Sequence, residues 1–375
     1  MQDLQDFLSP VSFAEINDDE IYTDGQLGRH ILTQEDENFD INKADIVLIG
    51  VRECRGNGTT DKENNAADMI RKQLYRLHYW HTDIIIADAG NIATGATLND
   101  SYAAIRTVLG ELYSRKKTVI IIGGSHDITL AQYNAYRLTD SLPEATCIDS
   151  EINLRSESHL PAENFLMEMF TGEPNIMKHY NHIGFQSYFV HPRMLETIDK
   201  LRFDCYRLGN VQENIEEMEP VLRNTNMLSV DISAIKYSDA PANKNCPNGL
   251  TGIEACMLTR FAGMSDNLNS IGIYGYAPAH DIEDMTARQI SQMLWYFIDG
   301  RHRMKQESSL EDRNQFNEYH TVFAEVDTTF LQSKRTNRWW MQMPDGRFIA
   351  CSQNDYLTAG NNDIPERWLR VQERG

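Results

Sequence analysis

The sequence predicts an α/β protein of three layers, α/β/α, with a mostly parallel central sheet. Short apolar runs rich in β-branched residues alternate with longer amphipathic runs through residues 45–300. Residues 46–50 and 118–122 are such runs, and a glycine ends or follows each of them. Strands that are apolar throughout are typical of parallel sheets covered by helices on both faces.

The same periodicity places the individual elements. Strands are expected at residues 46–50, 84–87, 118–122, 145–148, 183–185, 227–230 and 270–274. Helices are expected at residues 68–79, 100–114, 128–138, 253–262 and 286–299. Residues 88–91, Asp-Ala-Gly-Asn, are predicted to form a turn, because these residue types favour turns.

The length and pattern predict three regions along the 375 residues. Residues 1–44 are expected to form an N-terminal extension, residues 45–300 the α/β domain, and residues 301–375 a C-terminal extension that packs on the core. The last region has a β-rich pattern and contains the pair Trp339-Trp340. Clustered tryptophans can form a partner-binding hot spot, but ordinary packing is the preferred interpretation.

Composition argues against two classes of partner. With 35 basic and 55 acidic residues the formal charge is −20, which disfavours binding to nucleic acid and to anionic membranes. No apolar stretch is long enough for a membrane span, and the first residues do not have the pattern of a secretory signal. None of the six cysteines forms a CxxC pair. We therefore expect a cytoplasmic protein.

Polar residues with ligating side chains follow three of the predicted strands. His126 follows the strand at 118–122, and Asp149, Glu151 and Asn153 follow the strand at 145–148. After the strand at 227–230 come Asp231 and Ser233. Alternate residues of an extended chain point the same way, so these donors can converge on one divalent ion such as Mn²⁺. The alternative for any single aspartate is a helix cap.

These segments resemble motifs of one enzyme family. The segments are Gly-Gly-Ser-His-Asp at 123–127, Asp-Ser-Glu-Ile-Asn at 149–153, Ser-Val-Asp-Ile-Ser at 229–233 and Gly-Leu-Thr-Gly-Ile-Glu at 249–254. Over residues 45–300 the chain is similar to arginases, agmatinases and formimidoylglutamases, the ureohydrolases, and most similar to a divergent formimidoylglutamase-like branch. The resemblance implies an arginase-like fold, hydrolysis of a linear carbon–nitrogen bond in a small amidine or guanidine, and a homo-oligomer.

The resemblance also implies a set of metal ligands, which is altered in this chain. The family's six ligand positions fall on His126, Asp149, Glu151, Asn153, Asp231 and Ser233. Glu151 stands where the family has a histidine and can still bind a metal. Asn153 and Ser233 stand where the family has aspartates and are weak or lost ligands. We therefore expect one Mn²⁺ ion or none rather than the pair of ions implied by the family.

Two further residues are candidates for substrate binding. By resemblance Glu254 faces the guanidinium-like group of the substrate, and its alternative role is a first-turn glutamate stabilised by the helix dipole. His159 follows the second motif and could approach the substrate, with a surface histidine as the alternative. The sequence does not assign a catalytic residue.

Three functions stay open on the sequence alone. The first is a metal-dependent, formimidoylglutamase-like hydrolase. The second is a catalytically inactive relative that keeps the scaffold for ligand binding or protein interaction. The third is a site for a single metal, in which His126, Asp149 and Asp231 hold zinc as the histone deacetylases do.

Overall fold

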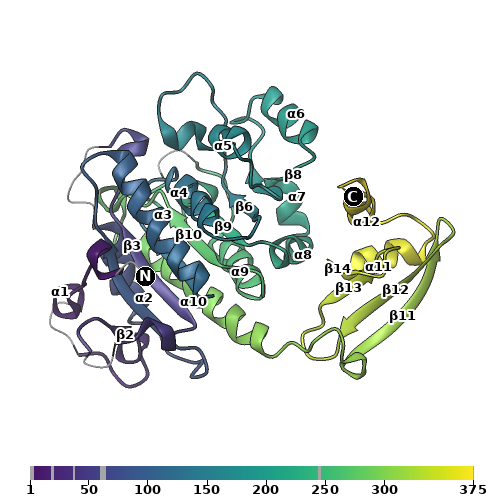
Figure 1. Ribbon diagram of the computed structural model, residues 1–375, viewed down its shortest axis with the longest axis horizontal. Helices are drawn as coiled ribbons and strands as arrows, with labels where there is room; N and C mark the ends of the chain where they lie inside the picture. Colours follow the sequence, from purple (N-terminus) through teal and green to yellow (C-terminus); the bar gives the residue numbers. More distant parts are fainter. Residues whose placement is uncertain (1–3, 18–20, 37–38, 60–64, 244–245, 375) are drawn as a thin grey trace.

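The structure is a computed structural model that describes residues 4–17, 21–36, 39–59, 65–243 and 246–374 (Figure 1). A ten-stranded sheet forms the centre of its larger part, in the order β1-β4-β3-β5-β10-β9-β6-β7-β8, with β2 beside β4. Every pairing in this sheet is parallel except that of β1 with β4. The strands are β1 (Leu8–Ser9), β2 (Leu32–Thr33), β3 (Ile46–Val51), β4 (Ile86–Ile92), β5 (Thr118–Ile122), β6 (Glu144–Ile148), β7 (His179–Phe185), β8 (Asp204–Arg207), β9 (Met227–Asp231) and β10 (Ser270–Tyr274).

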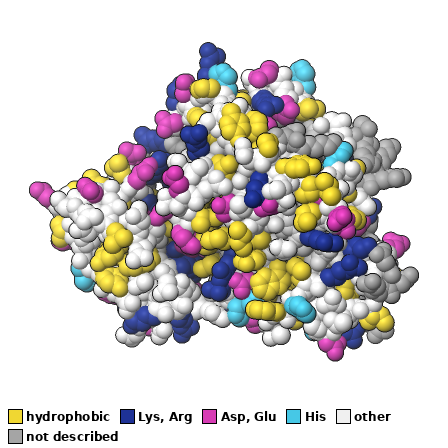
Figure 2. All heavy atoms as spheres, turned by 180° about the vertical axis from the view of Figure 1, so that it is seen from behind, with side chains coloured by type: hydrophobic (Ala, Val, Ile, Leu, Met, Phe, Trp, Pro, Cys, Tyr) yellow, Lys and Arg dark blue, Asp and Glu magenta, His cyan; other side chains and the backbone are white. Residues whose placement is uncertain are grey.

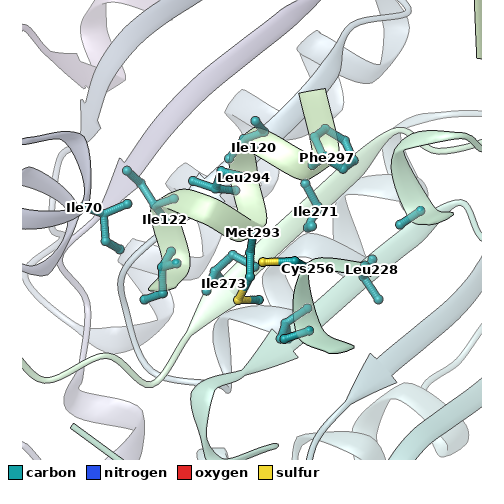
Figure 3. Packing of buried hydrophobic residues seen from close by; sticks show 14 of the residues in the cluster. Ile70, Ile120, Ile122, Leu228, Cys256, Ile271, Ile273, Met293, Leu294 and Phe297 are labelled. Carbon is teal, nitrogen blue, oxygen red and sulfur yellow. The ribbon is translucent and has the colours of Figure 1, made fainter. Parts of the chain in front are cut away.

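Helices cover both faces of the sheet, because alternate residues of the apolar strands point to opposite sides. Ile120 and Ile122 of β5 belong to one buried cluster, with residues of α2, α9 and α10, and Figure 3 shows part of it. Val119 and Ile121 belong to a second cluster, with residues of α3, α4 and α5. The helices of this part are α1 (Phe13–Asn17), α2 (Ala66–Leu74), α3 (Leu98–Ser114), α4 (Ile128–Asn134), α5 (Pro161–Thr171), α6 (Pro192–Lys200), α7 (Leu208–Glu213), α8 (Met218–Arg223), α9 (Gly252–Gly263) and α10 (Met285–Lys305).

The predicted three-layer α/β/α fold is therefore confirmed. The predicted strands that correspond to β3, β5 and β10 agree with the structure to within one residue at each end. The helix predicted at residues 68–79 begins earlier and ends at Leu74, and α10 extends six residues beyond its predicted end. Helices α5 to α8 lie in a part of the chain where the sequence analysis placed none.

The predicted turn at residues 88–91 is wrong, because β4 continues to Ile92 and buries this polar segment. The fully buried guanidinium of Arg71 makes the burial possible. Its Nε and Nη2 donate to the carboxylate of Asp88 at 2.7 and 3.0 Å, and its Nη1 donates to Asn91 Oδ1 at 2.6 Å. The hydroxyl of Tyr75 also donates to Asp88. A buried charge with a partner can stay inside a sheet, and one without a partner cannot.

The chain after α10 forms a separate antiparallel sheet, in the order β11-β12-β13-β14, followed by two helices (Figure 1). Its elements are β11 (Phe316–Phe323), β12 (Val326–Ser333), β13 (Trp339–Gln342), β14 (Phe348–Cys351), α11 (Gln353–Gly360) and α12 (Glu366–Arg374). Arg223 of α8 donates to the carbonyl of Trp339 at 2.8 Å, and Arg338 donates to the carbonyl of Met264 at 2.9 Å. The bounds proposed for the three regions of the chain stay a prediction.

The tryptophans of this C-terminal part serve its packing. Trp339, Trp340 and Trp368 are each less than a tenth exposed and lie in two small apolar clusters. The guanidinium of Arg223 also lies over the ring of Trp340, 4.5 Å from its centroid. These contacts agree with ordinary packing rather than with an exposed hot spot.

The surface mixes charges of both signs. On the face drawn in Figure 2, acidic and basic side chains are interspersed with apolar ones, so the described residues of that face do not gather into one acidic patch. All six cysteines are free thiols. Among the described residues, no helix has both the length and the apolar character that a membrane crossing requires.

We predict that Arg71→Met lowers the free energy of unfolding by about 3–5 kcal/mol, because it leaves the carboxylate of Asp88 buried without its cation. Urea denaturation measures this change. The control is Arg115→Met, which removes a partly exposed ion pair with Glu111 in α3 and should cost less than about 1 kcal/mol. Equal effects of the two substitutions would contradict the role assigned to Arg71.

A second prediction concerns acid stability at Asp204, the first residue of β8. Burial raises the pKa of this carboxyl, but the hydrogen bond with His179 and the charges of Arg374 and Arg370 outweigh it and hold the pKa well below its usual range. The ionised carboxylate therefore contributes stability above the unfolded pKa of about 4, and this is lost as the pH falls through the folded value.

Asp204→Asn should accordingly cost on the order of 2 kcal/mol at neutral pH, and the difference from the wild type should shrink as the pH falls below about 4. Urea denaturation at a series of pH values measures both effects. The exposed Asp266 supplies the control, since Asp266→Asn should stay within about 0.5 kcal/mol of the wild type throughout. A cost for Asp204→Asn that is the same at every pH would refute this account.

Candidate metal centre

Neighbouring parallel strands bring the candidate ligands to one edge of the sheet. β5, β10, β9 and β6 lie side by side, with Ile122 of β5 opposite Ile273 of β10 and Val230 of β9 opposite Ile148 of β6. Asp231 is the last residue of β9, and Asp149 directly follows β6. The carboxyl ends of parallel strands are where the fold collects functional groups.

A tight glycine turn carries His126 back to this edge. Gly123 and Gly124 follow β5 with φ of +82° and +83°, a conformation that residues with a side chain rarely adopt. A Cβ at Gly123 would also lie 2.6 Å from the carbonyl oxygen of Val51 at the end of β3. The turn therefore requires glycine, and it starts α4 two residues after His126.

The imidazole of His126 lies between two carboxylates. Its Nδ1 is 3.0 Å from Asp149 Oδ2 and 3.7 Å from Asp231 Oδ2, and the imidazole and the Asp149 carboxylate are almost completely buried. Its Nε2 shares a hydrogen bond of 2.9 Å with Ser229 Oγ, which in turn shares one of 2.5 Å with Thr129 Oγ1. Ser229 and Thr129 thus hold the ring so that Nδ1 faces the acids.

The electrostatics of this group favour a positive charge between the acids. Burial lowers the pKa of His126, but contact with Asp149 and the charges of Asp149 and Asp231 outweigh it, so the pKa lies well above its usual value. Burial raises the pKa of Asp149, yet the close contact with His126 and the charge of its imidazole leave the pKa lowered. The pKa of Asp231 is raised, mainly by burial.

The donor types of these residues suit one divalent cation, although the ligating atoms of His126, Asp149 and Asp231 do not all lie within 4.8 Å of one another. His126 Nδ1 is a buried nitrogen that completes no hydrogen bond of acceptable geometry, although a carboxylate oxygen lies 3.0 Å away. An imidazole nitrogen and two carboxylates form a donor set that suits Mn²⁺ and Zn²⁺. A cation at this position would bind the nitrogen that completes no hydrogen bond and compensate the negative charge of the two acids.

The positions expected to be weak ligands make other contacts. Ser233 Oγ donates to Asp149 Oδ1 at 2.6 Å, and the amide of Ser233 donates to Asp231 Oδ1 at 2.8 Å. Ser233 therefore joins the two acids through neutral donors. The amide nitrogen of Asn153 donates to the carbonyl of Ala162 at 2.9 Å, and its buried Oδ1 has no hydrogen-bond partner.

The carboxylate of Glu151 forms an ion pair with Arg155, which also lies 3.5 Å from Glu163. Burial raises the pKa of Glu151 more than the charge of Arg155 lowers it. The backbone bends at Ser150 and Glu151 instead of continuing extended. Alternation of side chains therefore stops directly after Asp149, and Glu151 and Asn153 are not aligned by strand geometry. Their role as ligands stays a prediction.

The two candidate substrate residues lie in different settings. Glu254 closes a capping box at the start of α9, where its Oε2 accepts from the amide of Thr251 at 2.7 Å and its own amide donates to Thr251 Oγ1. Gln212 also donates to Glu254 Oε2, at 3.2 Å. His159 is exposed in the loop before α5. A role of Glu254 or His159 in substrate binding stays a prediction.

Several residues that the sequence analysis did not single out support this centre. Besides Ser229 and Thr129, Ser150 Oγ donates to Ser233 Oγ at 3.2 Å. The position of Ser229 had a signal in the sequence, since it lies two residues before Asp231 on one strand and shares its face. No local pattern marks the others.

A cavity of about 810 Å³ lies elsewhere, between the core and the C-terminal part. Its walls include Glu144 and His179 at the starts of β6 and β7, together with Arg367 and Arg370 of α12. None of the predicted site residues lines it. It is therefore separate from the candidate metal centre.

Comparison with known proteins identifies relatives of this chain. Residues 44–299 match the sequence profile of the Arginase family. The formimidoylglutamase of Hahella chejuensis is 24% identical over 255 residues, which are 61% of this chain and 76% of that protein. The formimidoylglutamase of Staphylococcus haemolyticus is 20% identical over 304 residues, which are 74% of this chain and 94% of that protein.

Solved structures share the fold. The crystal structure of Trypanosoma cruzi formiminoglutamase with Mn²⁺ superimposes with a TM-score of 0.66 at 19% identity. The match covers 75% of this chain and 99% of that chain. The described C-terminal sheet, β11 to β14, follows the part of the chain that matches the family profile.

We predict that Asp231→Asn weakens binding of Mn²⁺ by more than about tenfold, because changes outside the ligand shell already cost tenfold or more. Isothermal titration calorimetry on metal-free protein measures the affinity. The control, Asp140→Asn, removes an exposed carboxylate from a loop and should leave the affinity unchanged. An unaltered affinity in Asp231→Asn would exclude Asp231 as a ligand.

Proposed function

Because the chain belongs to the arginase family, we propose that it is a formimidoylglutamase-like hydrolase of linear carbon–nitrogen bonds in small amidines or guanidines. One observation carries the proposal: Nδ1 of buried His126, which completes no hydrogen bond, faces the carboxylates of Asp149 and Asp231. The family has the same three residue types at the corresponding positions of its motifs. The substrate class rests on the formimidoylglutamases among its relatives.

We further propose that the centre holds a single Mn²⁺ ion, with His126, Asp149 and Asp231 as its protein ligands. Bound there, Mn²⁺ would supply Lewis-acid chemistry for the attack of water on the amidine carbon. The chain's own contribution is positioning: Ser229 and Thr129 fix the imidazole, and Ser233 holds Asp149. Burial of His126 and Asp149 excludes bulk water from the ligating atoms, and this strengthens their electrostatic interactions.

One observation favours a second candidate, a catalytically inactive member that uses the scaffold for binding. Ser233 Oγ donates to Asp149 Oδ1, so this oxygen is not free for a second cation. Asn153 directs its amide nitrogen to Ala162 of α5. A centre that needs two ions would therefore lose the second ion when Ser233 and Asn153 make these contacts instead of binding a metal.

Activity and metal content decide between the two candidates. Purified protein with Mn²⁺ is assayed for hydrolysis of formimidoylglutamate, arginine, agmatine and guanidinobutyrate. We expect hydrolysis of at least one of them, with one Mn²⁺ per chain by elemental analysis. A folded, metal-loaded protein that is inactive on all four would refute the hydrolase and support the binding scaffold.

The double variant Ser233→Asp/Asn153→Asp tests the cause of the altered stoichiometry. Added carboxylates repel Asp149 and Asp231 without metal, so the melting temperature of the metal-free protein should fall. Mn²⁺ compensates the repulsion, so it should raise the melting temperature more than in the wild type, with two ions bound per chain. The control Ser233→Asn/Asn153→Gln adds bulk without charge and should bind no second ion.

A further inference from the structure

We propose that the chain has a second metal site, for Zn²⁺, formed by His81, Asp83 and His302. One ligating atom from each of these residues lies within 4.8 Å of the other two. It is the one group of three histidine, cysteine or carboxylate side chains in the described part of the chain that meets this distance. The proposal does not depend on the hydrolase function, because none of its ligands belongs to the centre at His126.

Two elements that are far apart in the sequence supply these ligands. His81 and Asp83 lie in the turn before β4, where the amide of Ile84 donates to the carbonyl of His81 at 3.0 Å. His302 lies in the last turn of α10. The turn is fastened to α10 on both sides of the cluster: Trp295 Nε1 donates to the carbonyl of His78 at 2.8 Å, and Lys305 Nζ donates to the carbonyl of Asp83 at 2.6 Å.

The two imidazoles lie against one another, and one of them contacts the carboxylate. The rings of His81 and His302 stack with centroids 4.3 Å apart, and His302 Nδ1 lies 2.7 Å from Asp83 Oδ1. The side chain of His81 is only 10% exposed. Its Nε2 is buried and completes no hydrogen bond of acceptable geometry. Two imidazoles and an acid at these distances offer three donor atoms for one cation.

Asp299 adds negative charge next to this cluster, but its carboxylate already has other partners. It precedes His302 by three residues, on the same face of α10. Its Oδ1 lies 3.0 Å from His81 Nε2, whereas its Oδ2 contacts the guanidinium groups of Arg260 at 2.8 Å and Arg303 at 3.3 Å. In the proposed site Asp299 therefore holds His81 through Nε2 and leaves Nδ1 to the metal, since metal-binding histidines commonly direct their other ring nitrogen to a carboxylate.

The donor set selects zinc over the ions preferred by oxygen-rich sites. Two imidazoles and one carboxylate are typical of Zn²⁺ sites with three protein ligands, which leave the fourth position to water. Mn²⁺ and Mg²⁺ prefer carboxylate, carbonyl and water ligands. On binding, Zn²⁺ replaces the hydrogen bond between His302 Nδ1 and Asp83 Oδ1.

A cation at this site would cross-link the turn before β4 to the end of α10. The chain continues from α10 into the C-terminal sheet, so the site lies at the junction between the core and that sheet. Bound Zn²⁺ stabilises the folded chain in proportion to the logarithm of its concentration over the dissociation constant.

Titration of the metal-free full chain with Zn²⁺ tests the proposal. His302→Gln and Asp83→Asn should each remove one equivalent of Zn²⁺ per chain or weaken its binding at least tenfold, by calorimetry. The matched control is His320→Gln, at an exposed histidine of β11, which should bind as the wild type does. Both site variants change surface positions, and circular dichroism confirms that they fold.

Co²⁺ provides a readout that locates the metal. Trp295 lies 5.8 Å from His81 and 5.6 Å from Trp80, measured between ring centroids. Co²⁺ should therefore quench part of the tryptophan fluorescence in the wild type and in His320→Gln, but not in His302→Gln. Wild-type stoichiometry, affinity and quenching in both site variants would overturn the proposal, and so would wild-type protein that binds no Zn²⁺ outside the His126 centre.

Discussion

Parallel pairing of β5, β10, β9 and β6 is the constraint on which the candidate centre depends. All four strands point the same way, so their carboxyl ends meet at one edge. His126, Asp149 and Asp231 are thereby brought together from residues 126–231 of the chain. A one-residue shift of β9 against β6 would turn Asp231 to the other face of the sheet. The apolar strands that specify the register therefore also specify the site.

At three places in this molecule, buried polar or charged side chains require partners that compensate them. At the sheet centre, Asp88 is buried in β4 and the guanidinium of Arg71 compensates it. At the candidate centre, the buried Asp149 and the largely buried Asp231 lie beside an imidazole. At the end of α10, His81 and His302 stack beside two acids. Only the first place holds a complete set of partners, and it is the place that serves structure alone.

Prediction from the sequence succeeded where local pattern decides structure. Apolar β-branched runs gave the strands of the central sheet, and strand-end positions gave His126, Asp149 and Asp231 as neighbours. It failed at β4, because the burial of Asp88 depends on Arg71 in another element. It also could not give the contacts of Glu151 and Asn153, since the backbone bends after Asp149 and the alternation of side chains ends there.

The helices α5 to α8 were missed because they are short or have mixed patterns, and tertiary packing stabilises such helices more than their own propensity does. The site at the end of α10 was missed for a different reason. Its ligands come from residues 81, 83 and 302, and no spacing rule connects a turn to a helix more than two hundred residues later.

The last strand of the central sheet has a consequence for how copies of the chain can meet. β8 has only four residues and one neighbour among the described strands, β7. Its first residue, Asp204, carries the guanidinium groups of Arg370 and Arg374 from α12. A short edge strand such as β8, with a helix fastened across its first residue, offers little template for the addition of another strand. Growth of the central sheet by strand addition at β8 is thereby discouraged.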